Sequence, residues 1–254
     1  MRVELSDDGG YRLDQEEAIG DLLQSNGLTD ANATLTLIEN HSKDEQQSDA
    51  ELFGSVNAPP EPTVRDLKSL VAKRIARYLK GTAKLKITMK PSQSDNAAAL
   101  HCQNVSLDAF SDADFAGDRA DRKSMTGGVL LLNVMPIRWD ARKQGGVSLS
   151  TMEAEFVAAS EIAWKMLGVQ EMLMEIGLSP ALPMQLPIDI QAAISQIVVE
   201  GKARGLPLQV LMLSGRCRFI EARYVMSELM LADLLTKALD RNKLRTLRVL
   251  MKIG

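Results

Sequence analysis

The sequence is poor in aromatic residues, cysteine and histidine, and each shortage excludes something. Aromatic residues make up 4% of the 254 residues, so a hydrophobic core must be built from Leu, Ile, Val, Met and Ala. Cys102 and Cys217 are too few for a disulfide framework, which favours a reducing intracellular setting, cytoplasmic or nuclear. Together with His41 and His101, they also provide poor material for a Cys/His zinc site.

Long apolar runs are lacking as well. No run approaches the roughly 18 residues that a membrane span needs. The first residues lack the basic start and the apolar centre of a signal peptide. We therefore expect no membrane association.

The composition, with 45% hydrophobic and 25% charged residues, indicates a soluble globular protein with one large domain, or one domain and a fragment. The net charge of −3 hides an uneven distribution. Residues 1–63 carry 14 acids and 3 bases, residues 64–90 carry 9 bases and 1 acid, and the remainder is balanced. An anionic partner would be attracted to the basic stretch.

The N-terminal third reads as short elements separated by polar segments. The pattern predicts a hairpin over residues 2–13, a helix over 15–25, a helix over 64–80 and a short strand over 85–89. Residues 39–63 and 91–104 are predicted linkers.

From residue 105 onward, three sequential strands precede strands that alternate with helices. The expected strands are 105–115, 127–132, 137–141, 184–188 and 219–224, and the expected helices are 150–176, 191–199 and one beginning at 231–239. This order predicts an α/β (α+β) fold in which helices cover a mixed sheet.

Four acids, each at the end of a strand or the start of a helix, are the candidate site: Asp112, Glu153, Asp189 and Asp233. Four carboxylates brought together can hold two divalent metal ions, which suit phosphodiester hydrolysis and hence a nuclease.

Each acid also has an ordinary structural interpretation. Asp112 and Asp114 point to one face of a strand, which could be solvated. Glu153 completes an S-x-x-E capping box, and Glu155 competes with it for the site, although it faces a different side of the helix. Asp189 could cap a helix, and a helix dipole favours any acid at Asp233.

The predicted basic helix is a candidate for binding the phosphate backbone of a nucleic acid, the alternative being a solvated helix face. Its candidate residues are Arg65, Lys68, Lys73, Arg74, Arg77 and Lys80.

Several flanking motifs, in a fixed order, carry a family resemblance. They are Ser111 to Asp118 (SDADFAGD), Asp121 to Ser124 (DRKS), Pro136 to Trp139 (PIRW), Lys143-Gln144, Leu149 to Phe156 (LSTMEAEF) and Leu231 to Lys237 (LADLLTK). With these motifs, residues 105–250 resemble the ribonuclease H domain of copia-type LTR retrotransposon polyproteins. Residues 1–53 resemble a truncated tail of the reverse transcriptase, and 54–104 contain a linker and the basic connection helix.

The resemblance implies a ribonuclease H-like mixed five-stranded sheet with flanking helices. It also implies that Asp112, Glu153, Asp189 and Asp233 are catalytic, bind two Mg²⁺ ions (or Mn²⁺) and cut the RNA strand of an RNA–DNA hybrid. The implied partners are that hybrid and the remainder of the polyprotein.

The sequence also departs from the family pattern. Ile190 follows Asp189 where the family has Asn, and residues 202–210 replace a His-containing segment. The polymerase's catalytic Asp-Asp motif is absent, so we expect no polymerase activity. Two alternatives stay open: a catalytically inactive retroelement remnant, and a nucleic-acid-binding module without catalysis.

Overall fold

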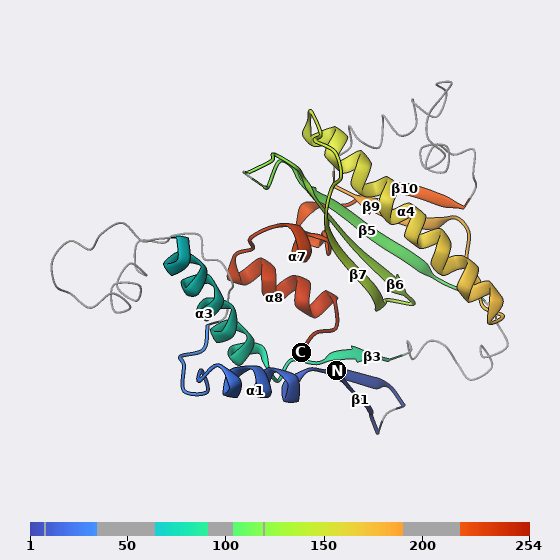
Figure 1. Ribbon diagram of the computed structural model, residues 1–254. Coiled ribbons are helices and arrows are strands. Elements are labelled where there is room, and N and C mark those ends of the chain that lie inside the picture. The colour runs from blue at the N-terminus through green and yellow to red at the C-terminus, as the bar shows by residue number, and fades with distance from the viewer. Residues whose placement is uncertain (8, 35–63, 91–103, 119, 190–218) are drawn as a thin grey trace.

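The main body of the protein is a mixed five-stranded sheet. A computed structural model describes residues 1–7, 9–34, 64–90, 104–118, 120–189 and 219–254 (Figure 1). The strands are β5 (Leu107–Asp114), β6 (Met125–Leu132), β7 (Met135–Lys143), β9 (Met184–Ile188) and β10 (Ile220–Tyr224). Their order in the sheet is β10-β9-β5-β6-β7; β5, β6 and β7 are antiparallel, whereas β9 and β10 run parallel to β5. The mixed sheet expected from the sequence is confirmed.

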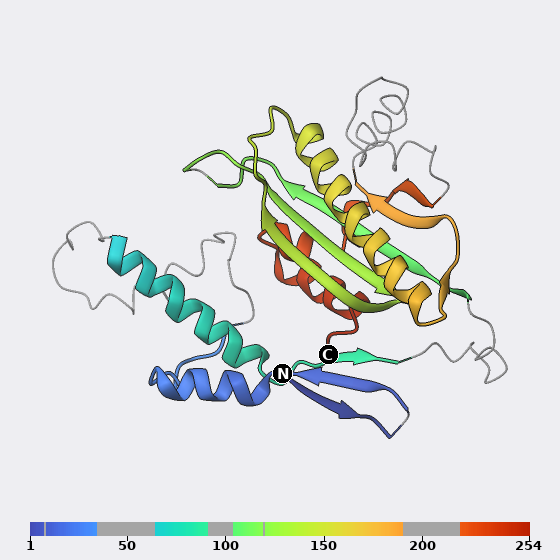
Figure 2. The same ribbon diagram turned by 45° about the vertical axis from the view of Figure 1, so that its right-hand side comes forward.

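Helices cover both faces of this sheet. The long helix α4 (Thr151–Glu175) crosses one face, and α7 (Asp233–Thr236) and α8 (Arg241–Leu250) lie on the other (Figures 1 and 2). Strand β6 contributes side chains to the apolar clusters on both faces of the sheet. Leu130 belongs to the cluster under α4, and its neighbours Val129 and Leu131 belong to the cluster under α8. This alternation is what a strand buried on both faces requires.

Smaller elements complete this body. Strands β4 (Asn104–Val105) and β8 (Ser179–Pro180) form a short parallel pair, and the 3-10 helix η2 (Ser227–Leu229) precedes α7.

The end of the chain differs from the expected single helix beginning at 231–239. Helix α7 stops at Thr236, and a separate helix begins at Arg241. Asp240 explains the new start, because its carboxylate accepts hydrogen bonds from the backbone N–H groups of Asn242 and Lys243.

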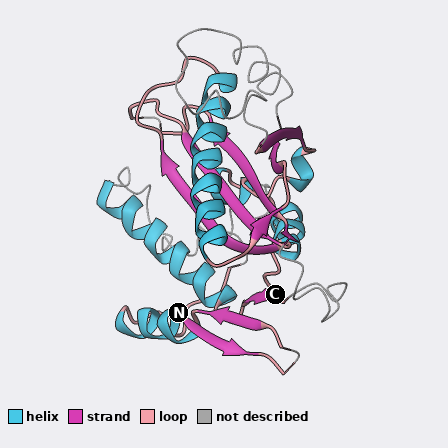
Figure 3. Cartoon of the chain, turned by 90° about the vertical axis from the view of Figure 1, so that its right-hand side faces the viewer, coloured by secondary structure: helices cyan, strands magenta, loops and turns pink. Residues whose placement is uncertain are grey.

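The N-terminal third forms a second, three-stranded sheet. It consists of β1 (Arg2–Leu5), β2 (Tyr11–Asp14) and β3 (Ile87–Met89), with helices α1 (Glu16–Ser25) and α3 (Val64–Thr82) beside it (Figure 3). The predicted hairpin is present as β1 and β2. The predicted linker 39–63, the predicted helix 191–199 and residues 91–103 of the predicted linker 91–104 lie outside the described residues; Asn104 already belongs to β4.

The end of the chain joins the two sheets. The backbone N–H of Lys86 donates to the carbonyl of Gly254 (3.0 Å), and that of Thr88 donates to the carbonyl of Lys252 (2.9 Å). Arg248 on α8 donates a 2.6 Å hydrogen bond to the Tyr78 hydroxyl on α3. The division of the chain at residues 53 and 104 into three parts stays a prediction.

Candidate metal centre

Strand register brings the first two acids together. Strands β5 and β9 are parallel, and Asp108 pairs with Gln185. Asp112 and Asp189 each come four residues later, so they stand at the same level where both strands end. Asp112 is completely buried, which rules out a solvated strand face, and the Asp189 side chain is 11% exposed.

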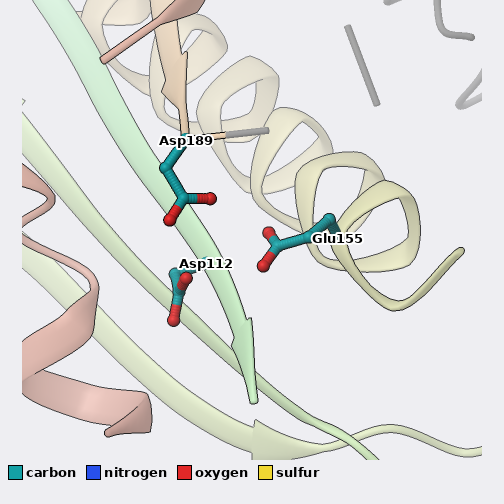
Figure 4. Close-up of side chains that lie close together, drawn as sticks. All are labelled: Asp112, Glu155 and Asp189. Carbon is teal, nitrogen blue, oxygen red and sulfur yellow. The ribbon is translucent and has the colours of Figure 1, made fainter. Parts of the chain in front are cut away.

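A third carboxylate, from Glu155 near the start of α4, joins them. One oxygen from each of Asp112, Glu155 and Asp189 lies within 4.8 Å of the others, and the three side chains converge (Figure 4). Glu155 is only 4% exposed, and one of its oxygens accepts a 3.1 Å hydrogen bond from the backbone N–H of Ala113. The sheet and α4 together therefore form a cluster of three acids.

Glu153, the glutamate expected at the site from the resemblance, lies outside this cluster. Its carboxylate accepts a 2.6 Å hydrogen bond from the N–H of Leu149, and its own N–H donates to the Ser150 hydroxyl (3.1 Å). Ser150 thus caps α4, and the Glu153 side chain reaches back to the residue before the cap, an arrangement close to a capping box. The structure thus gives the cluster position to Glu155. One signal in the sequence could have indicated it: the capping box needs only the first of the two acids.

The fourth acid, Asp233, is held by two lysines beside the cluster. It is completely buried, and its two carboxylate oxygens accept hydrogen bonds from Lys237 (2.7 Å) and Lys243 (2.5 Å). Lys237 also donates to Asp112 (2.7 Å), and the Thr236 hydroxyl donates to the second oxygen of Asp112. The Lys237 ammonium group therefore lies between the carboxylates of Asp233 and Asp112. Sequence reasoning missed these lysines, because their role depends on how α7 and α8 fold back.

The close approach of α7 to the sheet depends on a glycine. Gly127 pairs with Asp112 across β5 and β6. A Cβ atom at Gly127 would come within 2.5 Å of the Thr236 methyl carbon and 3.0 Å of the Ala232 carbonyl oxygen. The missing side chain thus makes room for the helix that carries Asp233 and Lys237.

Burial is the largest influence on the pKa values of Glu155 and Asp112. Burial, reinforced by the nearby charges of Asp112 and Asp189, raises the pKa of Glu155 to about 8. Burial also raises the pKa of Asp112, against the opposing effect of its hydrogen bonds from Lys237 and Thr236. For Lys237, burial alone would lower the pKa, but the hydrogen bonds to Asp112 and Asp233 outweigh it and raise the pKa.

The donor atoms of the cluster suit a divalent cation. Glu155 Oε2 and Asp189 Oδ1 are buried, and neither has a hydrogen-bond partner among the described residues. Buried carboxylate oxygens without partners are costly unless a proton or a cation meets them. An all-oxygen set of this kind fits Mg²⁺ or Mn²⁺.

The basic helix is α3, and its candidate residues differ in environment. Lys80 donates to the backbone carbonyls of Thr29 and Ala31, so it ties α3 to the turn after α1. Lys73 is exposed, and Arg74 and Arg77 are half-buried. The side chains of Arg65 and Lys68 lie outside the described part. Nucleic-acid binding by this helix stays a prediction.

A mixed α/β body with buried carboxylates at the ends of two parallel strands defines a candidate metal-binding domain. No protein-family model matches the chain. It is 37% identical over 117 residues to the retrovirus-related Pol polyprotein from transposon RE1 of Arabidopsis thaliana, which covers 46% of this chain and 7% of the polyprotein. It is also 35% identical over 106 residues to the retrovirus-related Pol polyprotein from transposon TNT 1-94 of Nicotiana tabacum. That match covers 42% of this chain and 7% of the polyprotein.

These matches confirm the resemblance seen in the sequence: the chain is related to retrovirus-related Pol polyproteins of transposons. The match spans only a small part of those polyproteins. Among solved structures, the N-terminal RNase H domain of rv2228c from Mycobacterium tuberculosis is similar, with 15% identity and a TM-score of 0.36 over 52% of this chain and 90% of that one. A likeness of that size carries no argument about activity.

Proposed function

We propose that this chain is the ribonuclease H-like part of a copia-type retrotransposon Pol polyprotein. In this proposal it is a Mg²⁺-dependent endonuclease that hydrolyses the RNA strand of RNA–DNA hybrids. The observation that carries the proposal is the convergence of Asp112, Glu155 and Asp189, with two buried oxygens that lack partners among the described residues. The relationship to Pol polyproteins supplies the context in which such hybrids arise.

The residues of the site have two proposed roles: some would bind the metal ion, and others hold the binding carboxylates in place. Asp112, Glu155 and Asp189 would hold the divalent ion, which supplies Lewis acidity for attack on a phosphodiester. Ala113 fixes the Glu155 carboxylate through its N–H, and Lys237 and Thr236 fix Asp112. In the reaction a water oxygen bonds to phosphorus as the bond to the 3′ oxygen breaks, and one water proton ends on the 3′ hydroxyl.

A cleavage assay tests the proposal. The protein is incubated with a hybrid labelled on the RNA strand, with Mg²⁺, Mn²⁺ or chelator, beside the Asp112→Asn variant. We expect metal-dependent cleavage of the RNA strand and its loss in the variant. Folded wild-type protein that leaves the hybrid intact, or a variant that cleaves equally well, would contradict the proposal.

Two further outcomes identify the alternatives. Binding of the hybrid that persists without cleavage, with a steep salt dependence, would favour a nucleic-acid-binding module. Neither binding nor cleavage would favour an inactive remnant. Residues 195–218, where the active nuclease and the inactive remnant are expected to differ, lie outside the described residues. We also propose an intracellular location, cytoplasmic or nuclear. Among the described residues, no helix is long and apolar enough to cross a membrane.

A further inference from the structure

The four acids that the structure gathers here are Asp112, Glu155, Asp189 and Asp233, and they form two halves that differ in how their carboxylate oxygens are satisfied. In one half, Glu155 Oε2 and Asp189 Oδ1 are buried and have no partner among the described residues. In the other half, both oxygens of Asp233 accept hydrogen bonds from lysine ammonium groups, at 2.7 and 2.5 Å. Asp233 is therefore already satisfied, whereas the other half is short of a positive partner.

One lysine connects the halves. The Lys237 ammonium lies 2.7 Å from Asp112 Oδ1, 2.7 Å from Asp233 Oδ1 and 3.9 Å from Asp189 Oδ2. It thus occupies the position between two carboxylates where a bridging cation would be expected. Asp112 can still bind a metal ion, because each carboxylate oxygen carries a second lone pair.

The formal charges agree with one ion. With all groups ionised, the four carboxylates and the ammonium groups of Lys237 and Lys243 carry a net charge of −2. A single divalent cation neutralises that charge, and a second would add two uncompensated positive charges to a largely buried site, where uncompensated charge is expensive.

We propose that this site binds one divalent cation, between Asp112, Glu155 and Asp189, and that the Lys237 ammonium takes the place of a second ion between Asp112 and Asp233. This inference rests on the proposed function and changes the two-ion arrangement that the family resemblance implies. Lys237 is a positioning residue in this account, and Asp233 anchors it.

The test counts bound Mn²⁺ per chain in the absence of nucleic acid, by titration with detection of free Mn²⁺ by electron paramagnetic resonance. Wild type should bind one ion. Lys237→Met, which keeps the length of the side chain and removes its charge, should bind two. Lys165→Met is the control, because Lys165 pairs with Asp140 outside the site (3.3 Å), and it should bind one.

Two acid variants test the site without removing a lysine. Asp233→Asn should bind one Mn²⁺ with an affinity within about threefold of wild type, since Asp233 is not a ligand. Asp189→Asn should bind Mn²⁺ at least tenfold more weakly, because a ligand is lost. Circular dichroism and thermal unfolding establish that each variant is folded.

The outcomes separate this inference from the proposed function. Wild type that cleaves the hybrid and binds two ions overturns the inference alone. So does a folded Lys237→Met variant that still binds one ion, or an Asp233→Asn variant that loses Mn²⁺. Wild type that binds no Mn²⁺ and does not cleave overturns both.

Discussion

At the scale of single residues, two glutamates two positions apart have entirely different environments. Glu153 is exposed and caps α4, whereas Glu155 is buried beside Asp112 and Asp189. A helix turns by 100° per residue, so two positions suffice to move a side chain from solvent to the end of the sheet. The chemistry of the site therefore depends on which of the two acids faces β5.

Exchanging each glutamate for glutamine separates the two roles. Glu155→Gln should lower metal-dependent cleavage at least about 100-fold, because a charged ligand is lost. Glu153→Gln should keep cleavage and change the free energy of unfolding by less than about 1 kcal/mol, since glutamine also completes a capping box. Initial cleavage rates and urea unfolding check both; equal losses of activity would contradict the assignment of Glu155.

Glu155 should also make the stability of the metal-free protein fall as pH rises. Its pKa is about 8 in the folded protein and 4.5 as the ordinary value. Between these values the folded state holds a proton that the unfolded state has released, so stability decreases by up to about 1.4 kcal/mol per pH unit. The loss is complete above about pH 8.

The matching variant is Glu155→Gln, which cannot titrate. We expect its free energy of unfolding, measured in chelator by urea at several pH values, to depend less on pH from 4.5 to 8 than that of wild type. A slope equal to that of wild type would show that Glu155 titrates normally.

At the scale of elements, the site lies where α4 and α7, on opposite faces of the sheet, reach the ends of β5 and β9. Each helix is positioned by close packing on β6. A Cβ at Gly128 would meet the Ile162 side chain of α4 at 2.0 Å, and one at Gly127 would meet α7. Two adjacent glycines thus set how closely both helices approach.

Alanine at Gly127 should displace α7 and with it Lys237 from Asp112. We expect Gly127→Ala to lower the free energy of unfolding by about 1–3 kcal/mol, the usual cost of overpacking, and to lower cleavage as well. Gly168→Ala on α4 is the control: a Cβ there meets nothing within 4 Å, so it should be neutral or stabilise the helix by up to about 1 kcal/mol. Thermal and urea unfolding compare the two, and equal effects would contradict the packing argument.

At the scale of the whole molecule, the last residues join the N-terminal sheet to the larger body. Besides the two backbone hydrogen bonds to Lys86 and Thr88, Ile253 forms an antiparallel bridge with Ile87. Arg248 also lies over the Tyr78 ring, 5.6 Å from its centroid. The basic helix α3 is thereby held at a fixed place beside α8.

Removing residues 252–254 should loosen this junction. We expect hydrogen exchange at the amides of Lys86 and Thr88 to become faster, because their acceptors are Gly254 and Lys252. Amides within the β1–β2 hairpin, which pair with each other, should change less and serve as the internal control. Unchanged exchange at Lys86 and Thr88 would show that other contacts hold the junction.

The sequence by itself determined the order of the elements and the identity of most of the site. The spacing of apolar residues that indicates a strand or a helix depends only on neighbours along the chain. The five strands and the long helix could therefore be predicted close to their observed positions. The motifs around Asp112, Glu153 and Asp233 carried the family resemblance. The last helix was not foreseen as two, because the break after Thr236 depends on Asp240 capping a new helix.

Only the tertiary structure decided which glutamate enters the cluster and what holds Asp233. The sequence offers both Glu153 and Glu155, and the family resemblance pointed to Glu153; the two are distinguished by the face of α4 that packs on β5. Lys237 and Lys243 stand out only once α7 and α8 fold back across the sheet and bring ammonium groups to buried carboxylates. Contacts between residues more than a hundred positions apart, such as Lys237 with Asp112, arise from packing and strand register, which local patterns do not contain.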